Sequence, residues 1–543
     1  MKNRGKLLSG FIIFSMLFTI VLAGCSSNNA NELPDSGAES PAADNPDAKK
    51  IDLTMFMGTS GKDYPDGVDP SDNPFIDIVE KYSNVNLKMN VPGYADFKTK
   101  SDLLLASGKL PDIMHSWYPE EMEKAADEGA FIDLKKYYDN SPIVQKVISP
   151  EMMELAKSSD GHYYRIPMSY SDAPLGAGLL TRYDLVEKYN DGKWPTTIDE
   201  WVALMEKEHE ADPSAIVMSN RVMGDKGLSY GGVMYYQLYG APVYGYRVQN
   251  SKVISTFELP EYRAATVLMN KLFEDGVLEK DFATGKNYFS AWANNNSLMQ
   301  WNSSDQLVPA AQDAASGQND PLTKTWKLAM APPLTEYPTD AKYVWPYKNM
   351  PISGHGVYIS TSSKNPDRAW KVIEGFASDA LKEAVYWGTE GETYTVKDGK
   401  RIPDAAKLGD KNRAWTLGLM IIHGFVTGQD VKQALSTQIM GPDYAKVVYD
   451  SQIPIAELAE QKGYALSNFF RASDEASKKA AEEKQFITKT TVEAIMGRIS
   501  MDEFDKQVAV YHDKYGFMYD EMTTYLNDNK DELLKKGVIE AGW

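Results

Sequence analysis

The sequence Ile-Asp-Leu-Thr-Met-Phe-Met at residues 51–57 decides the fold class, because apolar side chains alternate along it at Ile51, Leu53, Met55 and Met57. Strict alternation of this kind predicts a β-strand. Apolar residues at helical spacing follow over residues 75–82, and alternation returns over residues 85–91. A strand, a helix and a second strand in this order form the unit of a parallel sheet. The pattern therefore predicts an α/β fold.

The remainder of the chain continues this alternation of helices and short strands. Residues 97–106 predict a second helix, and residues 111–114 predict a short strand. Two capping boxes, in which a hydroxyl and a carboxylate satisfy the first free N–H groups of a helix, occur at residues 197–200 and 500–503. Pro260 and Pro366 stand where a first helical turn tolerates a missing N–H. Further short strands are expected at residues 215–218, 298–301, 328–331 and 356–359.

The first 24 residues have the pattern of a secretory signal peptide. Lys2, Arg4 and Lys6 precede a mostly apolar segment at residues 7–21, and small residues then lead to Cys25, the only cysteine in the sequence. The apolar segment is shorter than the ~20 residues of a membrane-spanning helix. Leu-Ala-Gly-Cys at residues 22–25 resembles the bacterial lipobox, which implies that Cys25 is lipidated and becomes the first residue. We therefore expect a protein anchored to the extracellular face of a bacterial cell membrane.

Residues 26–50 contain no aromatic residue and no apolar periodicity, so they are expected to be a disordered tether. Residues 1–24 contain three of the 57 Lys and Arg and no acidic residue, which leaves 54 basic against 76 acidic side chains and a net charge of −22. Such a charge disfavours nucleic acid as a partner. With Cys25 on the anchor, no intramolecular disulfide can form, and the chain after the tether is long enough for two lobes.

No motif for catalysis, a cofactor or a metal is found. The six histidines form no HExxH or HxxxH pair, and the sequence contains no GxxxxGK[ST], GxGxxG or GxSxG motif. Two acidic stretches are candidates for calcium: the aspartates at every third position of residues 63–72, and Asn190-Asp191-Gly192 with the acidic residues that follow. Neither has the alternate spacing of a calcium loop. We expect no catalytic residue, no cofactor and no metal.

Six segments of the sequence, in order, resemble the extracellular solute-binding proteins of bacterial carbohydrate ABC importers, in particular the larger lipoprotein branch of this family. Their motifs read LLASGxxPDI, xGxfxdL, DGkxYxiP, RxDwL followed by wPtTxdEw, xGxEGxxY followed by dGk, and GxxsxdeF. The matching segments are residues 103–114, 128–134, 160–167, 182–201, 387–400 and 497–504. The resemblance extends from residue 51 to about residue 526.

This resemblance implies a two-lobe, periplasmic-binding-protein-like fold with a ligand cleft between lobes that are joined by hinge crossover strands. Residues 51–168 and 333–390 would form the N-terminal lobe, and residues 169–332 and 391–543 the C-terminal lobe. The expected function is capture of an oligosaccharide and its delivery to the membrane subunits of an ABC importer, by a protein that is a monomer. Ligand would close the two lobes.

Sugars present C–H faces to aromatic rings and hydroxyls to polar groups, so exposed aromatic and polar residues near strand ends are candidates for ligand contact. Trp117 and Trp301 are expected to hold the ligand from opposite lobes. His355 stands between two glycines, where a hydrogen-bonded hinge residue is the alternative. The full set of candidates is Thr59, Ser60, Trp117, Tyr170, Asp172, Trp301, Asn302, Trp345, His355, Trp387 and Glu390.

Three alternatives remain open from the sequence. A surface-anchored enzyme that degrades glycans would need only two carboxylates at a suitable distance. An anchored adhesin or sensor would bind another protein. Within the binding class, the ligand would be a peptide or a uronide in place of a neutral sugar, and an acidic sugar would require a cationic clamp, for which Arg182 and Arg221 are candidates.

Overall fold

The structure is a computed structural model of the chain, and it divides the chain into a unit Met1–Gly37 and a unit Ala38–Trp543. Cys25, the expected signal peptide and most of the expected tether lie outside the described residues. Among the helices of the described residues, none combines the length and apolar character needed to cross a membrane. The described residues are 49–59, 61–158, 160–170, 177–215, 217–218, 220–223, 227–231, 234–284, 299–303, 307–316, 324–338, 347–424 and 428–543.

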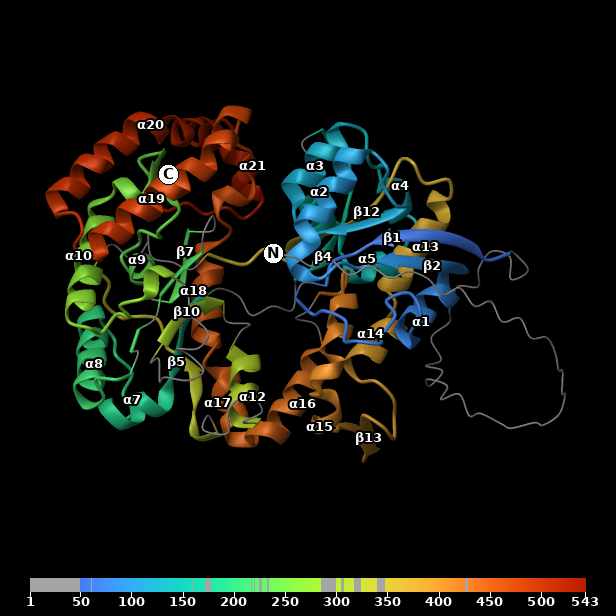
Figure 1. The fold of residues 1–543 in the computed structure, drawn as a ribbon, viewed down its shortest axis with the longest axis horizontal. Coiled ribbons are helices and arrows are strands. Elements are labelled where there is room, and N and C mark those ends of the chain that lie inside the picture. Colours follow the sequence, from blue (N-terminus) through green and yellow to red (C-terminus); the bar gives the residue numbers. More distant parts are fainter. Residues whose placement is uncertain are drawn as a thin grey trace, which may run out of the picture. The chain divides into compact units, whose positions relative to one another are not determined.

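The first sheet contains the strands that decide the fold class (Figure 1). Strand β1 (Ile51–Phe56) pairs in parallel with β2 (Val85–Asn90) and with β3 (Ile113–Ser116), as the strand–helix–strand pattern predicts. β12 (Ile352–Ile359) is antiparallel to both β3 and β4 (Ile166–Ser169). The order is β2-β1-β3-β12-β4, so a strand from far along the chain lies inside the sheet.

Helices accompany this sheet, and the helices predicted over residues 75–82 and 97–106 are among them. Helix α1 (Pro74–Ser83) begins after Asn73, whose side chain accepts hydrogen bonds from two N–H groups of the first turn. Helix α2 (Phe97–Ser107) is preceded by the 3₁₀ turn η1 (Tyr94–Asp96) and ends at Gly108, which has φ 63°. The other helices of this part are α3 (Pro119–Asp127), α4 (Lys135–Tyr138), α5 (Pro142–Val147), α6 (Pro150–Leu155), α13 (Pro366–Phe376) and α14 (Asp379–Tyr386).

The second sheet is formed by shorter strands in the order β11-β5-β10-β7-β6. Of the four short strands expected from apolar runs, two are present in this sheet, as β10 and β11, and a third is β12 of the first sheet. In the fourth expected strand, residues 215–218, Met218 makes only an isolated bridge to Leu278. The strands are β5 (Ala177–Arg182), β6 (Asn220–Met223), β7 (Gly227–Gly231), β10 (Met299–Ser303) and β11 (Leu328–Met330), and a separate hairpin joins β8 (Tyr246–Gln249) to β9 (Lys252–Ser255).

Helices also surround the second sheet. Both predicted capping boxes begin helices, since Thr197 caps α8 and Ser500 caps α20. The long helices α19 and α20 pack on each other, and α19 also packs on α10 (Figure 1). The helices are α7 (Tyr183–Asn190), α8 (Ile198–Ala211), α9 (Met234–Leu238), α10 (Pro260–Glu274), α12 (Leu307–Ser316), α17 (Pro442–Asp450), α18 (Ile453–Lys462), α19 (Asp474–Ile495), α20 (Met501–Asp528) and α21 (Lys530–Lys535).

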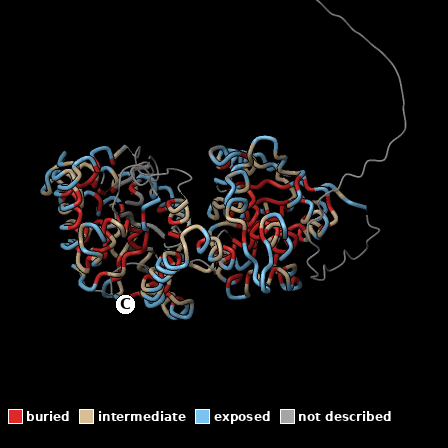
Figure 2. The backbone as a smooth tube through the Cα atoms, turned by 90° about the horizontal axis from the view of Figure 1, so that it is seen from below, coloured by how far each residue is buried: buried red, intermediate tan, exposed pale blue. Residues whose placement is uncertain are grey.

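Buried residues form one large core with the strands of the first sheet and another with strands of the second sheet, and Figure 2 marks the buried residues in red along the backbone. The N-terminal lobe is expected from the sequence to end at residue 390, but the core around the first sheet continues past this residue. Tyr394, Trp415 and Val431 pack in that core with Leu53 and Trp387. The 3₁₀ helix η8 (Lys411–Leu419) of this segment contacts α14. The elements of this segment are β13 (Tyr394–Lys397), β14 (Lys400–Pro403), α15 (Ala405–Leu408), η8 (Lys411–Leu419) and α16 (Gln429–Met440).

Candidate functional site

The candidate site lies at one edge of the first sheet. Strands β1, β2 and β3 are mutually parallel, and β4 runs in the same direction because both β3 and β4 are antiparallel to β12. The carboxyl ends of these four strands and the beginning of β12 therefore meet at the same edge. This edge carries Gly58, Tyr94, Trp117, Tyr170 and His355 on the segments that follow or begin the strands.

Trp117 is the centre of an aromatic cluster at this edge. Its ring stacks on Phe97 with centroids 3.8 Å apart and an interplanar angle of 21°, and lies nearly parallel to Tyr94 at 5.9 Å. The ring of His355 is 5.6 Å away. Tyr94 has 51% of its surface exposed, whereas Phe97 is fully buried. We call Tyr94, Phe97, Trp117, His115 and His355 the Trp117 cluster.

Gly58 makes room for this cluster directly after β1. A Cβ atom on Gly58 would lie 2.1 Å from Cζ3 and 2.5 Å from Cη2 of Trp117, and 2.6 Å from Cε2 of Phe97. These distances are far below van der Waals contact, so the indole ring packs directly on the backbone of the β1 terminus. The position of Trp117 thus depends on a glycine that is distant in the sequence but follows the strand next to β3 in the sheet.

Two histidines are hydrogen-bonded within the cluster. Nε2 of His115 and Nδ1 of His355 are 3.2 Å apart, and the rings are 5.3 Å apart at 29°. Burial lowers the pKa of His115 well below its usual value, and the neighbouring His355 contributes. Burial, with a contribution from the charge of Arg165, lowers the pKa of His355 to about 4. Both imidazoles are therefore uncharged at neutral pH.

Arg165 holds the irregular segment of β12 that carries His355. Its Nη1 donates to the carbonyl oxygens of Ser353, Gly354 and His355 at 3.3, 3.1 and 3.1 Å. The backbone of His355 also donates to Oγ of Ser353. The two glycines around His355 thus lie in the amino-terminal half of β12, where the guanidinium of Arg165 bonds to the backbone carbonyl oxygens.

Thr59 is linked to the cluster through Asp63. Its side chain is 2% exposed, and its hydroxyl donates to the carboxylate of Asp63. Asp63 in turn accepts the backbone N–H of Tyr94 at 3.2 Å. Thr59, predicted to touch ligand, is therefore placed to orient the segment that carries Tyr94. The backbone of Tyr170, another predicted contact, donates to the carbonyl of Pro351 at 2.7 Å and its side chain is half-buried.

Of the other predicted contacts, some belong to other parts of the fold and some lie outside the described residues. Trp387 is 4% exposed, packs edge-on against Tyr394, and donates its indole N–H to Asp430, so it belongs to the core. Glu390 is exposed before β13. Trp301 lies in the middle of β10 and not at its end, paired with Leu179 and Gly231. Ser60, Asp172 and Trp345, and the side chains of Trp301 and Asn302, lie outside the described residues.

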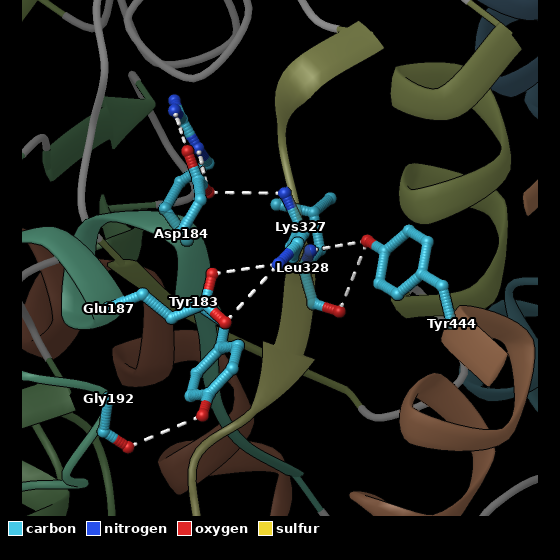
Figure 3. Close-up of polar contacts among 8 residues, drawn as sticks. Tyr183, Asp184, Glu187, Gly192, Lys327, Leu328 and Tyr444 are labelled. Carbon is cyan, nitrogen blue, oxygen red and sulfur yellow. Dashed lines mark hydrogen bonds and ion pairs between the residues drawn. The ribbon is translucent and has the colours of Figure 1, made fainter.

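Arg182 is not placed as a clamp for an acidic ligand. Its guanidinium is almost fully buried, pairs with Asp184 at 2.6 Å, and lies over the ring of Trp326. Figure 3 shows the surrounding contacts: Asp184 also accepts the backbone N–H of Lys327, whose Nζ pairs with Glu187. The network joins β5, α7 and β11, which indicates a structural role. The side chain of Arg221, the other clamp candidate, lies outside the described residues.

Sequence reasoning missed four members or supports of the site, namely Tyr94, Phe97, His115 and Arg165. The available signal was the pairing of aromatic residues at positions 94 and 97 shortly after a predicted strand.

Among the described residues, no group of acidic, histidine or cysteine side chains is arranged to hold a metal ion. In the two candidate stretches for calcium, Asp63 contacts Tyr94 as described, and Glu200 accepts the backbone N–H of Thr196 at 2.6 Å.

Comparisons with known proteins place this geometry in context. A carbohydrate ABC transporter substrate-binding protein of Streptococcus pneumoniae serotype 4 is 20% identical over 74% of this chain and 78% of its own. The polygalacturonan/rhamnogalacturonan-binding protein YtcQ of Bacillus subtilis is 22% identical, and the alignment covers 95% of this chain and 97% of YtcQ. The solved structure of an HMO-binding, ABC-transporter-associated solute-binding protein of Bifidobacterium longum infantis matches this chain with a TM-score of 0.67 and 16% sequence identity. The match covers 89% of this chain and 99% of that protein.

The solved structure shows that the chain has the two-lobe, periplasmic-binding-protein-like α/β fold that the sequence predicts. The family model described as bacterial extracellular solute-binding protein matches residues 69–383, which is more than half of the chain. This chain therefore belongs to the family of bacterial extracellular solute-binding proteins.

Proposed function

We propose that this protein captures an oligosaccharide outside the cell and delivers it to an ABC importer. The observation that carries the proposal is the Trp117 cluster, in which an exposed Tyr94 ring lies parallel to a Trp ring at the carboxyl edge of a sheet. Aromatic faces of this kind bind the C–H faces of sugars, and open strand ends are where α/β folds bind ligands. Relatives and a structural neighbour named for carbohydrate ligands support the same class of ligand.

The proposed mechanism is binding without chemistry. Ligand contacts the Trp117 cluster in one lobe and Trp301 in the other, and it favours the closed form because only that form offers both contacts. The first lobe in this proposal consists of residues 51–168 and residues from 347 to about 431, since the latter pack in the first core. The protein acts as a monomer with membrane subunits of the importer, tethered by a lipid on Cys25.

A direct test uses Tyr94, because its exposed ring can be removed with little effect on folding. Tyr94→Ala should weaken oligosaccharide binding by about 0.5–1.5 kcal/mol, the usual contribution of an aromatic contact beyond its buried area. Leu103→Ala on the neighbouring helix α2 is the matched control, since Leu103 is 65% exposed and belongs to no part of the cluster. A thermal-shift screen of oligosaccharides identifies ligands, since a ligand at 100 times its Kd adds about 2.7 kcal/mol of stability. Calorimetry with these ligands then measures the affinity of both variants.

The purified protein and the same oligosaccharides also distinguish the binding function from the enzyme and adhesin alternatives. A binding protein returns its oligosaccharide unchanged after prolonged incubation, whereas a glycan-degrading enzyme releases shorter sugars at a rate that one carboxylate substitution abolishes. An adhesin or sensor for another protein would show no stabilisation by any glycan. If Tyr94→Ala and Leu103→Ala bind the ligand equally well, the Trp117 cluster is not the sugar-binding surface.

A further inference from the structure

The carboxylate of Glu540 joins three segments that are far apart in the sequence. Its Oε1 accepts the hydroxyl of Tyr246 at 2.9 Å and the backbone N–H of Leu466 at 3.3 Å. Its Oε2 accepts the hydroxyl of Tyr347 at 3.3 Å. Glu540 is 7% exposed, and a buried carboxylate is costly unless donors surround it. These hydrogen bonds therefore hold the three segments to one another.

Two of the segments belong to the part of the chain around the second sheet. Tyr246 lies on β8, whose partner strand β9 packs on α20. Phe504 of α20 lies in the same core as Leu179 of β5. Leu466 is buried in a smaller core, which it shares with Val248 of the hairpin. Glu540 is thus fixed from two sides by elements of the second sheet's surroundings.

Tyr347, in contrast, lies on the connection that leads from β11 of the second sheet to β12 of the first. The next residue, Lys348, is held as well. Its backbone N–H donates to the carbonyl oxygen of Gly463 at 2.8 Å, and its Nζ pairs with Glu460 of α18 at 2.8 Å. Side-chain and backbone contacts thus fix this connection at two successive residues.

The other end of the connection is tied to the first sheet. The carbonyl oxygen of Pro351 accepts the backbone N–H of Tyr170 at 2.7 Å, and β12 begins at the next residue. Only Asn349 and Met350 separate the two sets of contacts. Hinge motions concentrate in the few residues that lie between fixed ends. A change of lobe orientation at this connection is therefore absorbed by the backbone of these two residues.

We propose that Tyr347 and Glu540 anchor a hinge, and that ligand-induced closure bends this connection at Asn349 and Met350. The proposal rests on the oligosaccharide capture proposed above and concerns how that capture is coupled to closure. Tyr347 and Glu540 are positioning residues, which act through the connection and not by touching ligand. Closure orders flexible segments at an entropic cost, and a connection whose end is already fixed loses less entropy. The anchor should therefore strengthen binding.

Hydrogen exchange of the ligand-free mature chain tests the anchor directly. In Tyr347→Phe, the amide of Lys348 should exchange about three- to tenfold faster than in wild type, because one hydrogen bond that holds the connection is lost. Tyr515→Phe is the matched control. It removes a hydrogen bond of 3.1 Å between the buried Tyr515 of α20 and Glu482, away from the connection. If both variants leave the exchange of this amide unchanged, the proposal is overturned.

Calorimetry tests the coupling to ligand. The probe is the tightest binder of wild type among fructo-, manno-, galacto- and galacturono-oligosaccharides. Tyr347→Phe should bind it about three- to tenfold more weakly, since the effect cannot exceed the contribution of the lost hydrogen bond. Tyr515→Phe should bind like wild type, although both variants should lose a similar free energy of unfolding. This difference separates a positioning role from a purely structural one.

A double-mutant cycle tests whether Tyr347 acts through Glu540. In a Glu540→Leu background, Tyr347→Phe should have no further effect on affinity. A full additional effect there, or wild-type affinity of the single variant Tyr347→Phe, overturns the proposal and leaves the capture function intact. If wild type binds none of the four classes of probe, the capture function is overturned, and the proposal with it. The exchange measurement and the single variant decide the matter even if Glu540→Leu fails to fold.

Discussion

Replacing Gly58 by alanine adds one methyl group at the point where the β1 terminus supports the Trp117 ring. The new Cβ would lie 2.1 Å from Trp117 Cζ3 and 2.6 Å from Phe97 Cε2, so at least one ring must move. The Trp117 ring cannot retreat easily, because Phe97 is stacked on it at 3.8 Å and is itself fully buried. Gly58 does not have the positive φ of many glycines of this chain, so alanine meets no backbone penalty there.

The magnitude follows from this geometry. Overpacking by a methyl group costs about 1–3 kcal/mol of unfolding free energy. Replacing glycine by alanine also restricts the unfolded chain, which adds about 0.4–1 kcal/mol of stability. Gly93→Ala has the second effect but not the first, because its Cβ would be 3.7 Å from the nearest atom, an Oδ2 of Asp63, and its φ is −57°. The difference between the two variants should therefore be about 1–3 kcal/mol.

The assay is urea unfolding of both variants, followed by calorimetry with the oligosaccharide ligand. Gly58→Ala should be less stable than Gly93→Ala and should bind more weakly, because the Trp117 ring leaves its position. Gly93 stands at the same edge of the sheet, so it also controls for proximity to the site. If the two variants agree within about 0.5 kcal/mol, the ordinary range for neutral surface changes, and bind alike, the packing of Trp117 on Gly58 is refuted.

Three further predictions concern other parts of the chain. Cys25→Ser should abolish incorporation of radiolabelled fatty acid, and unchanged labelling would contradict the lipid anchor. Trp301→Ala should weaken ligand binding by about 2–4 kcal/mol, as for a central contact, and should reduce ligand-induced compaction in small-angle scattering. If the variant compacts as much as the wild type, Trp301 does not contact the ligand. Burial raises the pKa of Glu208, on α8, to about 8. Its proton is thus retained on folding but released on unfolding, so stability should fall as pH rises from the ordinary glutamate pKa, about 4.3, to about 8. Glu208→Gln should remove this fall, which has a slope of about 1.4 kcal/mol per pH unit between the two pKa values, in urea unfolding at a series of pH values.

Local patterns in the sequence predict the elements of the first sheet well. The helices expected at residues 75–82 and 97–106 are present as α1 (Pro74–Ser83) and α2 (Phe97–Ser107). Alternation and helical spacing are properties of neighbouring residues, so a single sequence is enough to find them. The capping boxes of α8 and α20 are local for the same reason.

The site was less predictable because its contacts join distant parts of the chain. His115 and His355 are separated by 240 positions and meet only because β12 inserts between β3 and β4. Trp387 illustrates the opposite error. It ends a helix before a glycine, as an edge residue would, but its ring is covered by Tyr394 and by the guanidinium of Arg401. Neither contact has a signal in the spacing of apolar residues.

The arrangement of the Trp117 cluster separates a fixed part of the site from an adaptable part. Trp117 is held by Gly58 from β1, by Phe97 from α2 and by His355 from β12, so replacing its ring disturbs three elements at once. Tyr94 is half exposed, and Asp63 holds its backbone. A rigid ring lowers the entropy lost when a ligand binds, whereas an exposed ring can be exchanged without a stability cost. Changes of ligand preference should therefore be obtained by substituting Tyr94 while Trp117 and its supports are kept.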